Sequence, residues 1–145
     1  MLKGIPAIIS PELLKVLAEM GHGDEIVIGD GNFPAASMAD RLIRCDGHSV
    51  PALLKAILAV FPLDAYVEHP AALMEVVPGD KTKPVIWKEY SRIIKSAYPK
   101  FKGFEFVERF DFYERAKDAF AIVASGEMAL YANIILKKGV VTGSK

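Results

Sequence analysis

Apolar positions along the chain first follow a helical spacing and then a strand-like one. The helical stretch places four apolar residues on one face, at Leu13, Leu14, Leu17 and Met20. Ser10 precedes this stretch as a candidate N-cap, with Pro11 at the first helical position. We therefore predict a helix that ends at Gly21, followed by a strand at 25–29.

Helix-like and strand-like patterns of apolar residues continue to follow one another to the end of the chain. It predicts further strands at 41–45, 73–77, 104–107, 120–124 and 133–136, a short helical turn at 35–40, and helices at 50–61, 84–98 and 112–118. Asp111 and Glu114 have the spacing of a capping box for the last helix. Because strands alternate with helices, we predict one α/β domain over residues 1–145, a three-layer arrangement with a mostly parallel or mixed sheet flanked by helices.

Ser49 is a candidate N-cap for the predicted helix at 50–61. This helix is apolar almost all round, and Lys55 is its one charged residue. A helix of this kind is buried on every side, so we expect it to lie between the sheet and a neighbouring subunit. The mean hydropathy of +0.24 points the same way, since it indicates either a sheet covered on both faces or apolar surface that meets a partner.

Composition excludes several classes of protein. Hydrophobic residues make up 52% and charged residues 25% of the 145 residues, as in a folded domain. The 18 basic and 18 acidic residues cancel, so there is no basic field to bind a nucleic acid. No apolar run approaches the roughly twenty residues that span a bilayer. The single cysteine, Cys45, excludes an intrachain disulfide, and we expect a cytoplasmic protein.

The stretch 21–34 carries the most promising chemistry. His22 and Asp30 stand at the two ends of the predicted strand, each between glycines. Imidazole exchanges protons near neutral pH, so a histidine in a turn at the rim of a sheet suits acid–base chemistry on a small molecule. The same residues also fit a plain helix end, strand and turn.

Two cofactor classes find little support in the sequence. His22, Asp24 and Asp30 could bind a metal on paper, but the chain has no His-x-x-x-His or Glu-x-x-His pair. No glycine-rich phosphate loop opens a helix. We expect neither a metal nor a nucleotide cofactor.

Three later residues lie at predicted strand ends, where α/β sheets gather ligands. Arg109 could donate to a polyol, or it could pair with Glu108 or Glu105. Tyr131 and Asn133 offer both donors and acceptors at the start of the last strand.

Together these pieces resemble the ribose pyranase and L-fucose mutarotase family over residues 9–139. The segments that carry the resemblance are 10–14, 21–25, Asp30, 32–34, 109–116, the pair Tyr131 and Asn133, and 136–139. The segment 109–116 is more similar to the fucose branch than to the ribose branch. Ala132 departs from the glycine of fucose members.

The resemblance implies an enzyme that interconverts the α and β anomers of L-fucose or a related aldose without metal or cofactor. It implies that His22 is the proton donor. The sugar-binding positions that it implies are Asp30, Arg109, Tyr131, Ala132 and Asn133. It also implies a ring-like homo-oligomer, often a decamer. The alternatives are a D-ribose pyranase-type enzyme, a non-catalytic monosaccharide-binding module, and a metal-dependent hydrolase that uses His22 and Asp24.

Overall fold

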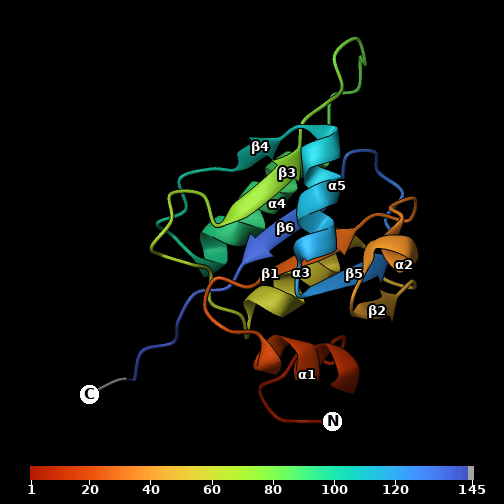
Figure 1. Ribbon diagram of the computed structural model, residues 1–145. Helices are drawn as coiled ribbons and strands as arrows, with labels where there is room; N and C mark the ends of the chain where they lie inside the picture. The colour runs from red at the N-terminus through yellow and green to blue at the C-terminus, as the bar shows by residue number, and fades with distance from the viewer. Residues whose placement is uncertain (144–145) are drawn as a thin grey trace.

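The computed structural model describes residues 1–143, and within them six strands form one mixed sheet (Figure 1). The strands are β1 (Glu25–Gly29), β2 (Leu42–Cys45), β3 (Ala71–Met74), β4 (Glu105–Val107), β5 (Ala121–Ser125) and β6 (Ile134–Lys137). Their order in the sheet is β2-β5-β1-β6-β3-β4. β6 is antiparallel to both of its neighbours, β1 and β3, whereas the β2–β5, β5–β1 and β3–β4 pairs are parallel. The predicted α/β class is therefore confirmed.

Five helices cover the two faces of this sheet. They are α1 (Pro11–Glu19), α2 (Ala35–Met38), α3 (Val50–Leu58), α4 (Ile86–Ala97) and α5 (Arg109–Asp118), counted over residues 1–143. The predicted serine caps are confirmed: the Ser10 hydroxyl accepts the N–H of Leu13 at 3.1 Å, and the Ser49 hydroxyl accepts the N–H of Ala52 at 3.4 Å. These bonds satisfy donors that a helix start leaves without a partner.

Successive residues of the central strand face two separate cores, as the pleat of a strand requires. Ile26 and Ile28 pack into the core that lies under α1, α3 and α4. Val27 packs into the second core, which lies under α2 and α5. In Figure 1, α5 lies in front of the sheet, and α3 and α4 lie behind it. The molecule therefore has the three layers that the sequence predicted.

Two local predictions were wrong. The third strand was expected at 73–77, but β3 ends at Met74 and the chain leaves the sheet in a loop that projects at the top of Figure 1. α5 begins at Arg109, because the Glu108 carboxylate, rather than a box of Asp111 and Glu114, accepts the N–H groups of Phe110 and Asp111. On α3, Lys55 and the alanines one turn before and after it are exposed within one chain, so the burial of this face against a neighbouring subunit stays a prediction.

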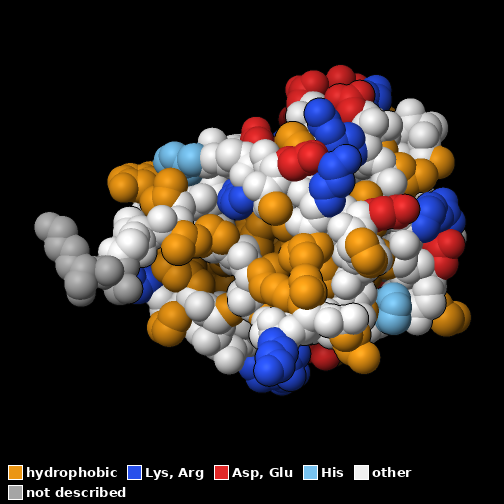
Figure 2. Space-filling model, turned by 90° about the horizontal axis from the view of Figure 1, so that it is seen from below, with side chains coloured by type: hydrophobic (Ala, Val, Ile, Leu, Met, Phe, Trp, Pro, Cys, Tyr) orange, Lys and Arg blue, Asp and Glu red, His pale blue; other side chains and the backbone are white. Residues whose placement is uncertain are grey.

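Apolar side chains also remain on the surface. Met1, Leu2, Met128, Leu130 and Val141 are each more than half exposed. Figure 2 views the molecule from the side of α1 and shows apolar side chains gathered over the middle of this face. Across residues 1–143, the structure has no helix with the length and apolarity needed to cross a membrane.

Candidate active site

A cavity of about 260 Å³ opens at the edge of the sheet where the parallel strands end. Its polar lining includes Asp30, Asp80, Arg109, Tyr113, Tyr131 and Asn133. Ligand cavities typically measure about 300–1,000 Å³, so a cavity of this size suits a molecule no larger than a monosaccharide. The structure thus brings four of the predicted site residues together: Asp30, Arg109, Tyr131 and Asn133.

Asp30 and Asn133 meet because of the register between two neighbouring strands. Ile28 of β1 lies opposite Ile134 of β6, so the residues just beyond them are neighbours although they are 103 positions apart. The backbone N–H of Asp30 donates to Asn133 Oδ1 at 2.8 Å. Both residues are more than 90% buried. The amide is thereby fixed, and the carboxyl group is fixed beside it.

The carboxyl group of Asp30 is an acid of the cavity that is held mainly by burial and backbone groups. Burial raises its pKa above the ordinary value, and the nearby carboxylate of Glu127 adds to the effect. The backbone N–H groups of Asn32, Ala132 and Phe33 oppose the rise but do not cancel it. A carboxyl group whose pKa is raised holds a proton more readily, which suits it to proton exchange.

Tyr131 adopts a left-handed backbone conformation, with φ at 54°. Non-glycine residues occupy this region at a cost, so neighbouring groups must hold the segment in place. α4 supplies two such bonds: the Trp87 indole donates to the Tyr131 carbonyl at 2.8 Å, and the Tyr90 hydroxyl donates to the Ala132 carbonyl at 2.7 Å. Ala132 itself is fully buried, so its side chain does not line the cavity.

The hydroxyl group of Tyr131 links the cavity to the loop after β3. It donates to Asp80 Oδ2 at 2.6 Å and accepts the N–H of Val77 at 3.3 Å. The bond from Tyr131 lowers the pKa of Asp80, and the same bond raises the pKa of the Tyr131 phenol. Because its one hydrogen is engaged, the Tyr131 hydroxyl can accept from a bound polyol more easily than it can donate.

Arg109 supplies the positive charge of the cavity from the first turn of α5. Its guanidinium carbon lies 5.7 Å from the ring centre of Tyr113 and 5.4 Å from that of Phe110. It does not pair with Glu105, which binds Arg115 instead. A hydrogen bond with the Tyr113 side chain raises the pKa of Arg109, and the other donors of the guanidinium can reach hydroxyl groups in the cavity.

His22 does not line the cavity, although it was the predicted proton donor. It precedes β1, whereas Asp30 follows it, and a five-residue strand separates the two by roughly 16 Å. His22 is therefore at the opposite edge of the sheet, with Nε2 3.1 Å from Asp64 Oδ1 and its ring centre 5.4 Å from that of Tyr66. Asp30 therefore cannot contact the His22 of its own chain.

The structure does not bring together the three residues of the possible metal site, His22, Asp24 and Asp30. Asp30 lies at the far edge from His22, and Asp24 Oδ2 accepts the N–H of Gly21 at 2.7 Å in the local turn. Among residues 1–143, no group of three or more histidine, cysteine or acidic side chains is placed to hold a metal ion.

Sequence reasoning missed several residues that build the site. Asp80 and Tyr113 line the cavity, and Trp87 and Tyr90 fix one wall of it. Asp80 follows Pro78 and Gly79, a pattern that indicates a turn and nothing more. Trp87 and Tyr90 fit the pattern of a helix face that packs on the core, so no local signal set them apart.

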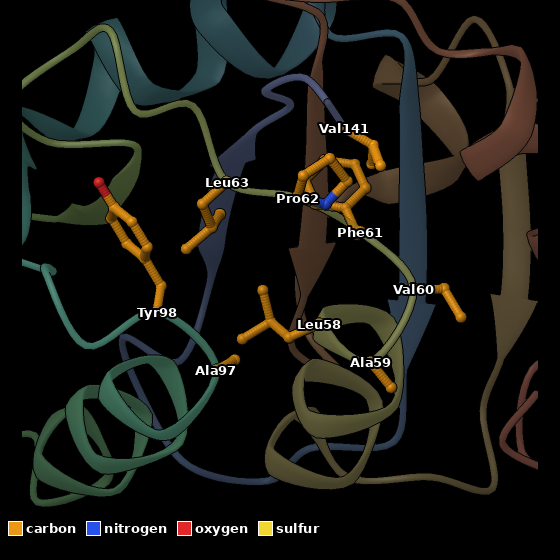
Figure 3. Close-up of a pocket in the computed structure, with 9 residues that line it drawn as sticks. All are labelled: Leu58, Ala59, Val60, Phe61, Pro62, Leu63, Ala97, Tyr98 and Val141. Carbon is orange, nitrogen blue, oxygen red and sulfur yellow. The ribbon is translucent and has the colours of Figure 1, made fainter. Parts of the chain in front are cut away.

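A second hollow, of about 360 Å³, has a different character. It lies where the ends of α3 and α4 meet the loop after α3, and Figure 3 shows Leu58, Phe61, Leu63, Tyr98 and Val141 along it. Among the side chains that line it, only Tyr98 carries a polar atom. It therefore lacks the convergent donors and acceptors that a sugar needs.

Comparison with known proteins places the chain among sugar-related enzymes. It is 58% identical to the fucose mutarotase of Mus musculus over 144 residues, which covers 95% of this chain and 94% of the relative. The crystal structure of the fucose mutarotase from Streptococcus pneumoniae in complex with L-fucose has a TM-score of 0.91 and 55% identity, covering 97% of this chain and all of that one.

A further solved structure, FucU from Bifidobacterium longum, has a TM-score of 0.94 and 57% identity, again over 97% of this chain and all of that one. The model of the RbsD / FucU transport protein family matches residues 3–141, nearly the whole length. The resemblance found in the sequence is therefore confirmed, and this chain belongs to the RbsD / FucU transport protein family.

Proposed function

We propose that this chain is a sugar mutarotase that interconverts the α and β anomers of L-fucose. The observation that carries the proposal is the cavity that joins Asp30, Arg109, Tyr131 and Asn133. It occurs in a chain that is 55–58% identical to proteins named fucose mutarotase, one of them solved with L-fucose.

The chemistry requires little beyond positioned acids and bases. A base removes the proton of the anomeric hydroxyl while an acid protonates the ring oxygen; the ring opens to the aldehyde, which turns about C1–C2 and closes on its other face. Acid–base catalysis by placed side chains typically contributes about 10²–10⁴-fold. In this proposal Arg109, Tyr131 and Asn133 hold hydroxyl groups, and Asp30 holds or exchanges a proton.

We further propose that His22 reaches the cavity from a second copy of the chain. Within one chain β1 separates His22 from the cavity, so His22 can touch a sugar there only across an interface. The exposed apolar side chains and the positive mean hydropathy favour such an interface. The resemblance implies a ring-like homo-oligomer, which we propose to be a decamer of a cytoplasmic protein. Such a ring would bring the His22 edge of one copy against the cavity of another.

The test is saturation-transfer NMR of anomer exchange on L-fucose, D-ribose and D-galactose. We expect exchange on L-fucose to be fastest and to be insensitive to a strong chelator. A faster rate on D-ribose would favour the ribose pyranase alternative. Sugar binding without any exchange would identify a binding module instead.

A mixing experiment tests the shared site. His22→Ala and Asp30→Ala should each be inactive alone. When the two variants are unfolded and refolded together, some sites take both intact residues, and about a quarter of the wild-type exchange rate should return. No recovery in a mixed oligomer of the correct size would place both residues within one chain. Light scattering establishes the size, and a clean monomer would contradict the proposed assembly.

A further inference from the structure

The helix that leads to His22 ends in an extended residue rather than in a left-handed glycine. α1 stops at Glu19, and Met20 after it has φ at −62° and ψ at 135°. The end of a helix leaves carbonyl groups without an intrahelical partner, which a glycine cap or a nearby basic side chain commonly satisfies. Because α1 has no basic residue in its last turn, the donor for these carbonyl groups must come from elsewhere in the fold.

Lys138 supplies this donor from the far end of the chain. Its ammonium group donates to the Leu17 carbonyl at 2.7 Å and to the Met20 carbonyl at 2.5 Å. A cation is favourable here, because the carbonyl end of a helix carries a partial negative charge. Lys138 follows β6 directly and lies 121 and 118 positions from these two partners, so the contact joins the end of α1 to the sheet.

The backbone of Lys138 holds the other side of the same turn. Its N–H donates to the Asp24 carbonyl at 2.8 Å, and its carbonyl accepts the N–H of Gly23 at 2.8 Å. His22 therefore lies between residues that Lys138 holds on both sides, Met20 before it and Gly23 after it. One residue fixes the backbone of the turn through four hydrogen bonds.

We propose that Lys138 is a positioning residue that places His22 for proton exchange with the sugar. This inference rests on the proposed role of His22 as the proton carrier. The side chain of His22 is 45% exposed, so its place depends on the backbone that carries it more than the place of a buried ring would. A misplacement of about 1 Å can cost about 100-fold in rate, so an anchored turn matters for catalysis.

The strand that carries Lys138 also holds the cavity edge. Asn133, directly before β6, accepts the N–H of Asp30, and Lys138, directly after β6, holds the turn of His22. The length of β6 therefore sets the spacing between the two edges of one copy. In the proposed ring each copy contributes its two edges to two different sites, so this spacing must be the same in every copy.

A purely structural role for Lys138 predicts different behaviour. In that case the ammonium group would only stabilise the end of α1, as the Ser10 hydroxyl stabilises its start. Loss of such a cap lowers stability by about 0.5–2 kcal/mol without any special effect on His22. Ser10→Ala is therefore the matched control, since it removes a cap of the same helix at the end remote from His22.

The first experiment compares exchange of L-fucose anomers by Lys138→Met and Ser10→Ala, each confirmed by light scattering to have the wild-type size. Methionine keeps an apolar stem but cannot donate to the two carbonyl groups. We expect kcat of Lys138→Met to fall about tenfold or more with little change in KM, because His22 acts in proton transfer rather than in binding. Lys138→Arg keeps the charge and the donors and should recover part of the rate. A wild-type kcat in Lys138→Met, or an equal loss in Ser10→Ala, would overturn the inference.

The double variant shows whether Lys138 acts through His22. At enzyme concentrations where residual exchange by His22→Ala exceeds the spontaneous rate, adding Lys138→Met should cost nothing further. A second loss of the same factor would overturn the inference and leave a structural role. If His22→Ala itself exchanges at the full rate, the proposed role of His22 fails first, and the inference fails with it.

Hydrogen exchange of backbone amides reads the turn directly and does not depend on activity. The Gly23 N–H is bonded to the Lys138 carbonyl, so it is protected while the turn stays anchored. Mass spectrometry of a peptide that contains residues 20–24 should show exchange about threefold or more faster in Lys138→Met and unchanged in Ser10→Ala. Wild-type protection of this peptide in Lys138→Met would overturn the inference.

Discussion

The two edges of the sheet are built in opposite ways. At the edge of the cavity, Asp30 and Asn133 are buried and held by backbone bonds, and aromatic donors of α4 fix the segment beside them. At the other edge, the side chain of His22 is 45% exposed and depends on a single buried partner, Asp64. The cavity edge has the sugar-sized cavity but no histidine in its lining, whereas the opposite edge has an exposed histidine that lines no such cavity.

This difference shows what a single fold can and cannot bring together. A strand carries residues at its two ends to opposite edges, however close they are in sequence. The pair His22 and Asp30 is therefore not a catalytic pair of one chain. If both act on one sugar, the oligomer is the catalytic unit. A single chain would then have no site at which His22 and Asp30 contact the same sugar.

The largest effect should follow from the loss of the carboxyl group at the cavity edge. Asp30→Asn keeps an acceptor for the N–H of Asn32, which Asp30 Oδ1 now accepts at 2.9 Å, but it cannot exchange a proton. We expect anomer exchange to fall about 10²- to 10⁴-fold, the contribution of a positioned acid or base. Asp40→Asn, an exposed acid outside the cavity, should leave the rate unchanged. An active Asp30→Asn would reduce Asp30 to a residue that binds the sugar.

Arg109→Ala should give the next largest effect, and on binding rather than on turnover alone. The guanidinium donates to the bound ground state, so its loss should raise KM for L-fucose about tenfold or more. Arg109→Lys keeps the charge but loses the planar fork, and we expect it to recover only part of the affinity. Lys117→Ala, at the other end of α5, is the control. A change in kcat with an unchanged KM would move Arg109 from binding to catalysis.

A smaller effect on stability should follow from Tyr90→Phe. The fully buried Tyr90 hydroxyl is the partner of the buried Ala132 carbonyl, and the variant leaves that carbonyl without it. An unsatisfied buried group costs about 1–3 kcal/mol, which urea unfolding can measure. Because the same bond holds the segment from Tyr131 to Asn133, KM should also rise. Tyr98→Phe, just past the end of the same helix and outside the cavity, should change neither quantity.

How far the sequence predicts this molecule depends on how local each feature is. The caps at Ser10 and Ser49 were predicted because a cap depends on three neighbouring residues. The Glu108 cap was missed because Glu is an uncommon cap and Asp111 with Glu114 offered a more familiar spacing. The strand order β2-β5-β1-β6-β3-β4 has no local signal, since it pairs strands from the two ends of the chain.

The same distinction applies to the candidate site. Asp30, Arg109, Tyr131 and Asn133 were named from motifs that stand beside predicted strands. Asp64 and Asp80 were not, because each enters its site through a loop whose path is set by distant contacts, with the end of β6 and with Tyr131. Strand geometry alone, applied to 25–29, would have placed His22 and Asp30 at different edges.

The smallest effect concerns the pH dependence of stability at the buried edge. The folded-state pKa of Asp30 is raised above its ordinary value of 3.8, chiefly by burial, so the folded protein binds this proton more tightly than the unfolded chain does. The stability that the protonated group contributes is fully present below about pH 4 and is lost as the pH rises through the raised pKa.

Asp30→Asn does not titrate, so its Tm should exceed that of the wild type most clearly at neutral pH. The Tm difference should shrink as the pH falls towards 4. Thermal unfolding of both proteins across this range measures it, with Asp40→Asn as the reference. A Tm difference that grows on acidification would mean that ionised Asp30 stabilises the fold. The cavity edge would then resemble the opposite edge, where burial opposes ionisation of Asp64 but the Tyr66 N–H and the His22 ring outweigh it and lower the pKa of that carboxyl group.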